Sequence, residues 1–256
     1  MKPIRLILLL AFEIFRSGCV PANAQDNYEI QVYQSDLVRS NHTMFELHSN
    51  TSLKKNRDDH LFSQDYFRET LEITHGFSRW FEVGSYLFTN VGIRNSTDIV
   101  GVHIRPRFAV PSDIGLPLGL SLSSELGYVR KKYSADEWTL ELRPIIDKKM
   151  KRLLLALNLV YSVSLDNTRT HKPELGAAFK ASYDAGIKAT PGIEYYGGYG
   201  ALASFMPANL QTHQVFGVVD LDLGPDWEFN SGLGWSLNEA SDRLIIKFIL
   251  GRRFGF

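Results

Sequence analysis

The chain has 256 residues, 28 acidic and 28 basic side chains, and a single cysteine. A formal net charge of zero argues against a nucleic-acid partner, because binding to phosphates requires a surplus of Lys and Arg. One cysteine excludes an intrachain disulfide and a multi-cysteine metal site.

The first 24 residues have the order of a secretory signal, with Lys2 and Arg5 before an apolar run from Ile4 to Phe15 and a small-residue segment ending at Ala24. We predict cleavage after Ala24, which also removes the only cysteine. That cysteine, Cys19, lies in a lipoprotein-like context, but an arginine stands where such a site has an aliphatic residue. Lipidation is therefore the less favoured alternative.

From residue 25 onward no run approaches the roughly 20 apolar residues of a membrane helix. Instead, apolar and polar residues alternate over segments of about 10 residues, the length of a tilted membrane strand. Between Val100 and Val110, for example, one face is apolar and the other carries His103, Arg105 and Arg107. The predicted strands are Thr43–Leu53, Tyr66–His75, Arg79–Thr89, Val100–Val110, Leu118–Tyr128, Trp138–Ile146, Leu153–Leu165, Lys172–Tyr183, Gly186–Gly198, Thr212–Leu223, Asp226–Leu237 and Ser241–Phe256.

The connections between these strands alternate in length, as they do in outer-membrane barrels. Tight turns are expected at Gly76–Ser78, Pro111–Gly115, Asp147–Met150, Asp184–Ala185 and Gly224–Pro225. The longer links are Lys54–Asp65, Asn90–Asp98, Arg130–Asp136, Asp166–His171, Tyr199–Gln211 and Asn238–Ala240. We predict an all-β fold, a closed antiparallel transmembrane β-barrel of 12 strands over residues 43–256. Barrels of 10 or 14 strands and a soluble all-β fold are the alternatives.

The segment Tyr28–Tyr33 also has the composition of a strand, but it would make the strand number odd. We therefore assign residues 25–42 to an N-terminal extension, which lies in the periplasm or inside the barrel as a plug.

The C-terminus has apolar residues at alternate positions and ends in an aromatic residue. Here the sequence resembles the insertion signal of bacterial outer-membrane barrels, which the barrel-assembly machinery reads. The resemblance implies a partner role for that machinery and a location in the outer membrane of a Gram-negative bacterium, in contact with outer-membrane lipid. The predicted signal residues are Phe248, Leu250, Phe254 and Phe256.

Four stretches resemble motifs of a family of uncharacterised bacterial outer-membrane barrel proteins. These stretches are Tyr28–Tyr33, Phe45–His48, Arg143–Asp147 and Glu194–Gly197. More remotely, the hairpin from Glu69 to Leu87 is similar to barrels of the meta-pathway for phenol degradation. Neither resemblance implies a substrate or a catalytic residue.

If the apolar faces contact lipid, the opposite faces line the lumen and carry charges of both signs. The leading candidates are Glu82, His103, Arg105, Arg107, Glu125, Glu141, Arg143, Lys188, Glu194 and Lys247. Further inward candidates are Glu46, His48, Arg68, Glu72, Lys180, Asp220, Glu228 and Arg253. We favour pairing between strands that fills the interior; a charged constriction that selects a small solute is the alternative. For Arg105 and Arg107, the expected partners are Glu82 and Glu125.

The sequence contains none of the common hydrolase, zinc-protease, phosphate-loop or calcium-loop motifs. We therefore predict no enzyme activity, no catalytic residue, no cofactor and no metal site. His48, His103 and His213 are each more consistent with a structural hydrogen bond than with a general base.

Aromatic residues fall near the predicted strand ends, where such rings prefer the membrane interface. An aromatic girdle is the favoured interpretation, and a stacking platform for sugars or aromatic solutes is the alternative. The residues concerned are Trp80, Tyr86, Tyr128, Trp138, Tyr195, Trp227 and Trp235.

These observations favour passive transport or binding of a small hydrophilic or aromatic solute. A non-conducting structural barrel and an outer-membrane hydrolase are the second and third hypotheses.

Overall fold

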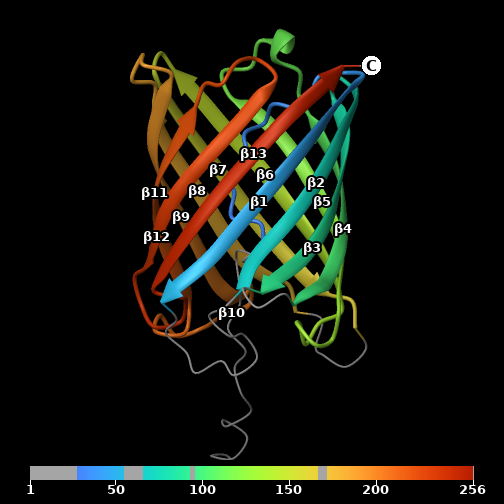
Figure 1. Cartoon of the computed structure of the whole chain (residues 1–256), viewed down its shortest axis with the longest axis vertical. Coiled ribbons are helices and arrows are strands. Elements are labelled where there is room, and N and C mark those ends of the chain that lie inside the picture. The colour runs from blue at the N-terminus through green and yellow to red at the C-terminus, as the bar shows by residue number, and fades with distance from the viewer. Residues whose placement is uncertain (1–27, 55–65, 93–95, 167–171, 256) are drawn as a thin grey trace, which may run out of the picture.

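The computed structural model describes residues 28–54, 66–92, 96–166 and 172–255. In this part of the chain, twelve long antiparallel strands and the two-residue strand β10 form one sheet, which closes through the pairing of β8 with β9 (Figure 1). The strands are β1 (His42–Lys54), β2 (Tyr66–Ser78), β3 (Phe81–Gly92), β4 (Thr97–Ala109), β5 (Gly119–Val129), β6 (Trp138–Met150), β7 (Leu153–Ser164), β8 (Glu174–Tyr183), β9 (Ala189–Ala201), β10 (Ser204–Phe205), β11 (Thr212–Leu221), β12 (Trp227–Ser236) and β13 (Leu244–Gly255). The predicted 12-stranded barrel is confirmed.

Both ends of the barrel wall lie on the side of the short turns, where His42 pairs with Gly255 (Figure 1). A 3₁₀ helix, η1 (Ser112–Ile114), lies in the turn between β4 and β5. No helix in the described ranges has the length and apolar character needed to cross a membrane.

Two predicted turns are wrong, because the strands continue through them. Asp147 to Met150 still pair with β7, and the chain reverses at Lys151, which has a φ of 55°. Likewise, Gly76 and Ser78 pair with β3, and the reversal follows at Arg79 and Trp80. The alternating pattern fades at these ends because the side chains are more polar there, although the backbone remains paired.

Alternation places apolar side chains on the outside of the barrel, as predicted. Ile104, Phe108 and Leu122 are each about half exposed, whereas the adjacent residues Arg105, Arg107 and Ser123 are buried. An outer face of this kind suits contact with lipid hydrocarbon.

Val100 is an exception to the predicted alternation. We expected it on the outer face with Val102, but it is fully buried inside the barrel. A bulge causes the difference: Phe88 pairs with Gly101 and Thr89 pairs with Ile99, which leaves one extra residue between them. An extra residue reverses the inside and outside positions that follow it.

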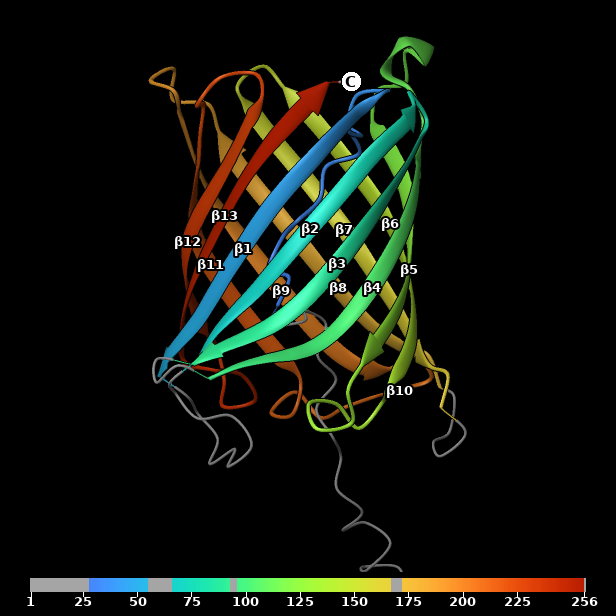
Figure 2. The same cartoon turned by 45° about the vertical axis from the view of Figure 1, so that its right-hand side comes forward.

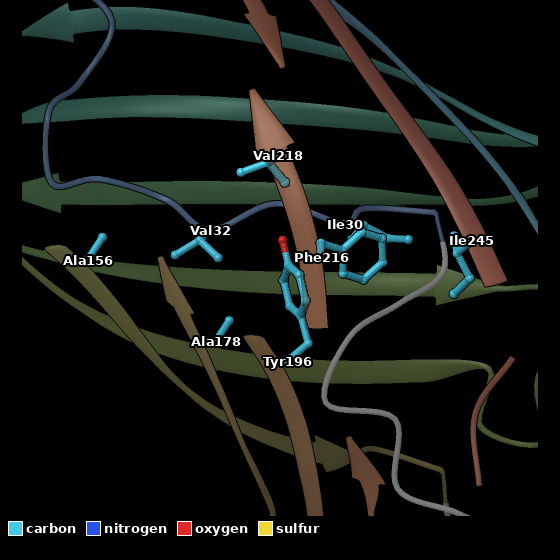
Figure 3. Packing of buried hydrophobic residues seen from close by; sticks show 8 residues of the cluster. All are labelled: Ile30, Val32, Ala156, Ala178, Tyr196, Phe216, Val218 and Ile245. Carbon is cyan, nitrogen blue, oxygen red and sulfur yellow. The ribbon is translucent and has the colours of Figure 1, made fainter. Parts of the chain in front are cut away.

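Residues 28–41 run through the lumen without joining the sheet (Figure 2). Ile30 and Val32 in this segment pack against inward-facing residues of the wall (Figure 3). Those wall residues are Ala156, Ala178, Tyr196, Phe216, Val218 and Ile245. Residues 28–41, hereafter the luminal segment, therefore give the barrel a packed interior. Residues 25–27 and the predicted signal lie outside the described residues.

Candidate functional site

Nine of the ten leading luminal candidates point into the barrel. Seven of them belong to three groups of charges around the luminal segment, and His103 and Glu125 form a separate pair. In the first group, Arg105 Nη2 lies 2.7 Å from Glu72 Oε1 and 3.8 Å from Glu82 Oε1. Arg107 Nε lies 2.9 Å from the same Glu82 oxygen. Both guanidinium groups also face the ring of Tyr33, with Arg105 Cζ 4.5 Å from its centroid.

One predicted partner is wrong. Glu125 binds His103 on the neighbouring strand β4 instead of the two arginines. Register alone would place Arg105 opposite Glu125, because His103 pairs with Gly127 and Arg107 pairs with Ser123. The guanidinium of Arg105 instead binds Glu72 on β2, and Glu125 binds its diagonal neighbour His103.

The second group surrounds Arg143 on β6. Its Nε donates to Glu141 Oε1 at 2.7 Å, and its Nη1 lies 3.5 Å from Glu29 Oε1 of the luminal segment. The hydroxyl of Tyr33 donates a further hydrogen bond to the same Glu29 oxygen. Arg143 thus joins the wall to the luminal segment.

Glu194 on β9 is the centre of the third group. Lys247 donates to its Oε2, Tyr196 donates to the same oxygen at 2.7 Å, and Lys180 Nζ lies 3.3 Å from its Oε1. Lys180 also lies 2.7 Å from Asp220 Oδ2. These are buried ion pairs with several partners each, so most of the interior charge is neutralised within the protein.

Lys188, the tenth candidate, is not a luminal residue. It is exposed in the turn between β8 and β9, with a φ of 56°. The predicted strand begins at Gly186, whereas β9 begins at Ala189, after Lys188.

The predicted aromatic girdle needs one correction, at Tyr86. The ring of Tyr86 is buried in the lumen beside Phe88 and Tyr33. The four tryptophans are exposed, as an outer girdle requires.

Side chains of the wall bind the backbone of the luminal segment along its length. Asn158 bonds both the N–H and the carbonyl of Tyr33, and Asp147 accepts from Ser35 N at 2.6 Å. Arg107 donates to the carbonyls of Gln34 and Asp36, at 3.3 and 2.5 Å. Glu82 accepts from Val38 N at 2.7 Å. Sequence reasoning did not predict these contacts, since they join residues that are far apart in the chain.

A cavity of about 480 Å³ remains between the luminal segment and the wall. It is lined by Glu46, Glu72, Arg105, Lys180 and Arg253, among others, and by residues 31–38 of the luminal segment. Lys149, Arg152 and Asp184 also line it, so the cavity lies towards the short-turn end.

Near the opposite end of the barrel, Asp98 joins two basic residues of the loop between β5 and β6. Arg130 Nη1 lies 2.5 Å from Asp98 Oδ1, and Lys132 Nζ lies 2.6 Å from Oδ2. The hydrogen bond to the carboxylate raises the pKa of the Lys132 ammonium, so this loop lysine remains charged over the physiological range.

The predicted C-terminal signal residues within β13 point outward. Phe254 contacts Phe45 with ring centroids 5.6 Å apart, and Phe248 contacts Phe229 at 5.2 Å. Leu250 shares their face, and Phe256 lies outside the described residues. Recognition by assembly machinery stays a prediction.

Comparison with known proteins gives structural matches only. No model of a known protein family matches the sequence. No curated protein sequence matches it either. Among solved structures, the KdgM porin aligns with a TM-score of 0.54 at 11% identity, covering 83% of this chain and 99% of the porin. The NanC porin gives 0.58 at 9% identity, covering 83% and 100%.

An outer-membrane channel from Pseudomonas putida F1 gives a TM-score of 0.59 at 11% identity, covering 88% of this chain and all of that one. The likeness at such low identity concerns the fold. The similarity to phenol-degradation barrels stays a prediction. The chain has the fold and the apolar outer face of a bacterial outer-membrane β-barrel, as the sequence predicted.

Proposed function

We propose that the protein is a passive outer-membrane channel for small hydrophilic solutes, and that its own luminal segment restricts the path. The observation that carries the proposal is the way this segment is held. Its backbone is bound by side chains such as Asn158, Arg107 and Glu82, and it does not pair with a strand. A segment attached in this way can shift while the hydrogen-bonded wall of the barrel stays intact.

The lining of the cavity supports a hydrophilic solute. Charged groups of both signs face it, and its volume of about 480 Å³ is within the usual range for small-molecule sites. Tyr33 and Trp227 also line it, which keeps an aromatic solute as the second choice.

A non-conducting barrel is the alternative, and the close packing of Ile30 and Val32 against the wall favours it. We assign no catalytic role. The His103 ring pairs with Glu125, and the His213 ring shares a hydrogen bond of 2.7 Å with the Tyr195 hydroxyl. Both contacts support structural roles for these histidines.

The test is ion conductance in planar bilayers, with the luminal segment locked or released. Val32 on the luminal segment and Ala156 on β7 belong to one apolar cluster (Figure 3), so a flexible, reducible thiol crosslinker between cysteines at both positions provides a reversible tether. We expect the crosslinked double variant to conduct less than its reduced form, and removal of residues 28–38 to give the largest conductance. The single cysteine variants, treated with the same crosslinker, are the controls.

A conductance that falls only when the tether is formed in the double variant would support the proposal. If wild type, reduced variant and deletion all fold and none conducts, the protein is a structural barrel and the channel proposal fails. Heat-modifiable migration on a gel verifies folding of each form.

A further inference from the structure

Two carboxylates and an imidazole meet on the inner face of the first two strands. Glu46 and His48 are two residues apart on β1 and therefore share a face, and Glu72 on β2 pairs directly with Glu46. One donor atom from each of the three side chains lies within 4.8 Å of the other two. All three residues are buried, and His48 is fully so.

This arrangement is unfavourable without a cation. Like charges directly opposite each other on paired strands repel, and burial removes the water that would screen them. Within the described residues, Glu46 Oε1, Glu72 Oε2 and both ring nitrogens of His48 have no hydrogen-bond partner. His48 Nε2 lies 3.4 Å from Glu72 Oε2. Ligands of a tetrahedral ion with bonds of about 2.1 Å are separated by roughly the same distance.

The other oxygen of Glu72 is already occupied. Thr74 Oγ1 and Arg105 Nη2 each donate to Glu72 Oε1 at 2.7 Å. These bonds turn Oε2 towards His48, which is how hydrogen-bonded neighbours commonly orient a metal-binding carboxylate. Arg105 contributes a single positive charge, whereas the cluster holds the two carboxylates Glu46 and Glu72.

Gly251 on β13 provides the space for Glu46, with which it pairs. A Cβ at this position would lie 2.7 Å from Glu46 Cγ. Glu46 and Glu72 also line the cavity, so the carboxylate side of the cluster borders the open space of the lumen.

We propose that Glu46, His48 and Glu72 bind one divalent transition-metal ion, with Zn²⁺ as the preferred occupant. One imidazole nitrogen and two carboxylate oxygens suit zinc, whereas Ca²⁺ takes six to eight oxygens and Mg²⁺ an octahedron of oxygens. A fourth position would face the cavity and accept water or a donor atom of a solute. The sequence indicates no such site, because the ligands come from two strands and form no local motif.

The test uses the full mature chain, without added histidines, refolded in detergent. Titration with Zn²⁺ against a chromogenic chelator should show one tightly bound ion per chain, which excess Ca²⁺ or Mg²⁺ does not displace. Glu46→Gln and His48→Asn should each weaken binding by about tenfold or more. Co²⁺ bound to the wild-type chain should give the visible absorption of a nitrogen- and oxygen-ligated site.

The matched control is a second histidine–carboxylate pair of the lumen, His103 and Glu125. Among the described residues, neither side chain belongs to a group of three metal-ligating side chains. His103→Asn with Glu125→Gln should leave zinc affinity unchanged. Glutamine at the more accessible His42, His75 and His213 should also retain the bound ion.

Absence of saturable uptake in the folded wild-type chain would overturn the metal site, and so would full affinity in the folded Glu46→Gln and His48→Asn variants. If these variants do not fold, Glu46→Asp, which retains the charge, and the wild-type Co²⁺ spectrum decide the question. Neither measurement depends on conductance, so the result is separable from the channel proposal.

Discussion

Asn158 on β7 makes two hydrogen bonds with the backbone of Tyr33: its Oδ1 accepts from the N–H and its Nδ2 donates to the carbonyl, both at 2.8 Å. A side-chain amide here takes the place of the peptide group that a neighbouring strand would supply. Because both partners are buried, the pair fixes the position of the luminal segment along the barrel axis.

Asn158→Ala should therefore loosen the luminal segment. Two buried backbone groups lose their partners, at a cost of about 1–3 kcal/mol each when no water replaces the amide. We expect the barrel to unfold at a lower temperature, which heat-modifiable gel migration measures. We also expect the channel to open more often in bilayers. Asn230→Ala is the control, because Asn230 is a buried luminal amide that bonds Asp220 at 2.6 Å. Equal effects of the two changes would count against a specific role for Asn158.

Lys247→Met should destabilise the folded barrel by about 3 kcal/mol or more, since removing one member of a buried ion pair leaves the other uncompensated. The change deprives Glu194 of one cation and the carbonyl of Ile30 of its 3.0 Å hydrogen bond. Urea unfolding in detergent measures the loss. Lys188→Met, at the exposed turn lysine, should have almost no effect on stability. An equal loss of stability in that variant would contradict a specific role for the ion pair of Lys247 with Glu194.

Alanine at both Arg105 and Arg107 should change ion preference as well as stability. Glu72 and Glu82 would remain in the lumen without their guanidinium partners, so the interior becomes more negative. We expect the reversal potential in a salt gradient to shift towards cation preference, and unfolding to require about 3 kcal/mol less. Arg79→Ala breaks an exposed pair with Asp113 and serves as the control. An unchanged reversal potential would show that these arginines have only a structural role.

Phe256→Asp should slow assembly into the outer membrane, if the terminal aromatic residue is the recognition signal. Pulse labelling followed by gel migration measures the rate, and the amount of folded protein should fall before its stability changes. Phe205→Asp, at an exposed phenylalanine outside the long strands, is the comparison. Normal assembly of the Phe256 variant would show that the terminal aromatic residue is not the recognition signal.

The sequence predicted the strands and their inner and outer faces because both depend on one local rule, the period of two. It failed at Val100, where the bulge interrupts that period. It also failed at Tyr86, which has the composition of an interface residue but packs against luminal rings. The course of the luminal segment was left open between periplasm and lumen, because its bonds to Asn158 and Lys247 depend on tertiary structure.

The hydrogen bond between Lys247 and Ile30 has a consequence for the folding of the barrel. These residues are separated by 217 positions, and Lys247 belongs to the final strand. Contacts between such distant positions carry a large entropic cost of loop closure until the intervening chain is in place. This hydrogen bond can therefore form only once β13 is in place, and we expect a probe at Ile30 to report a late step of barrel maturation.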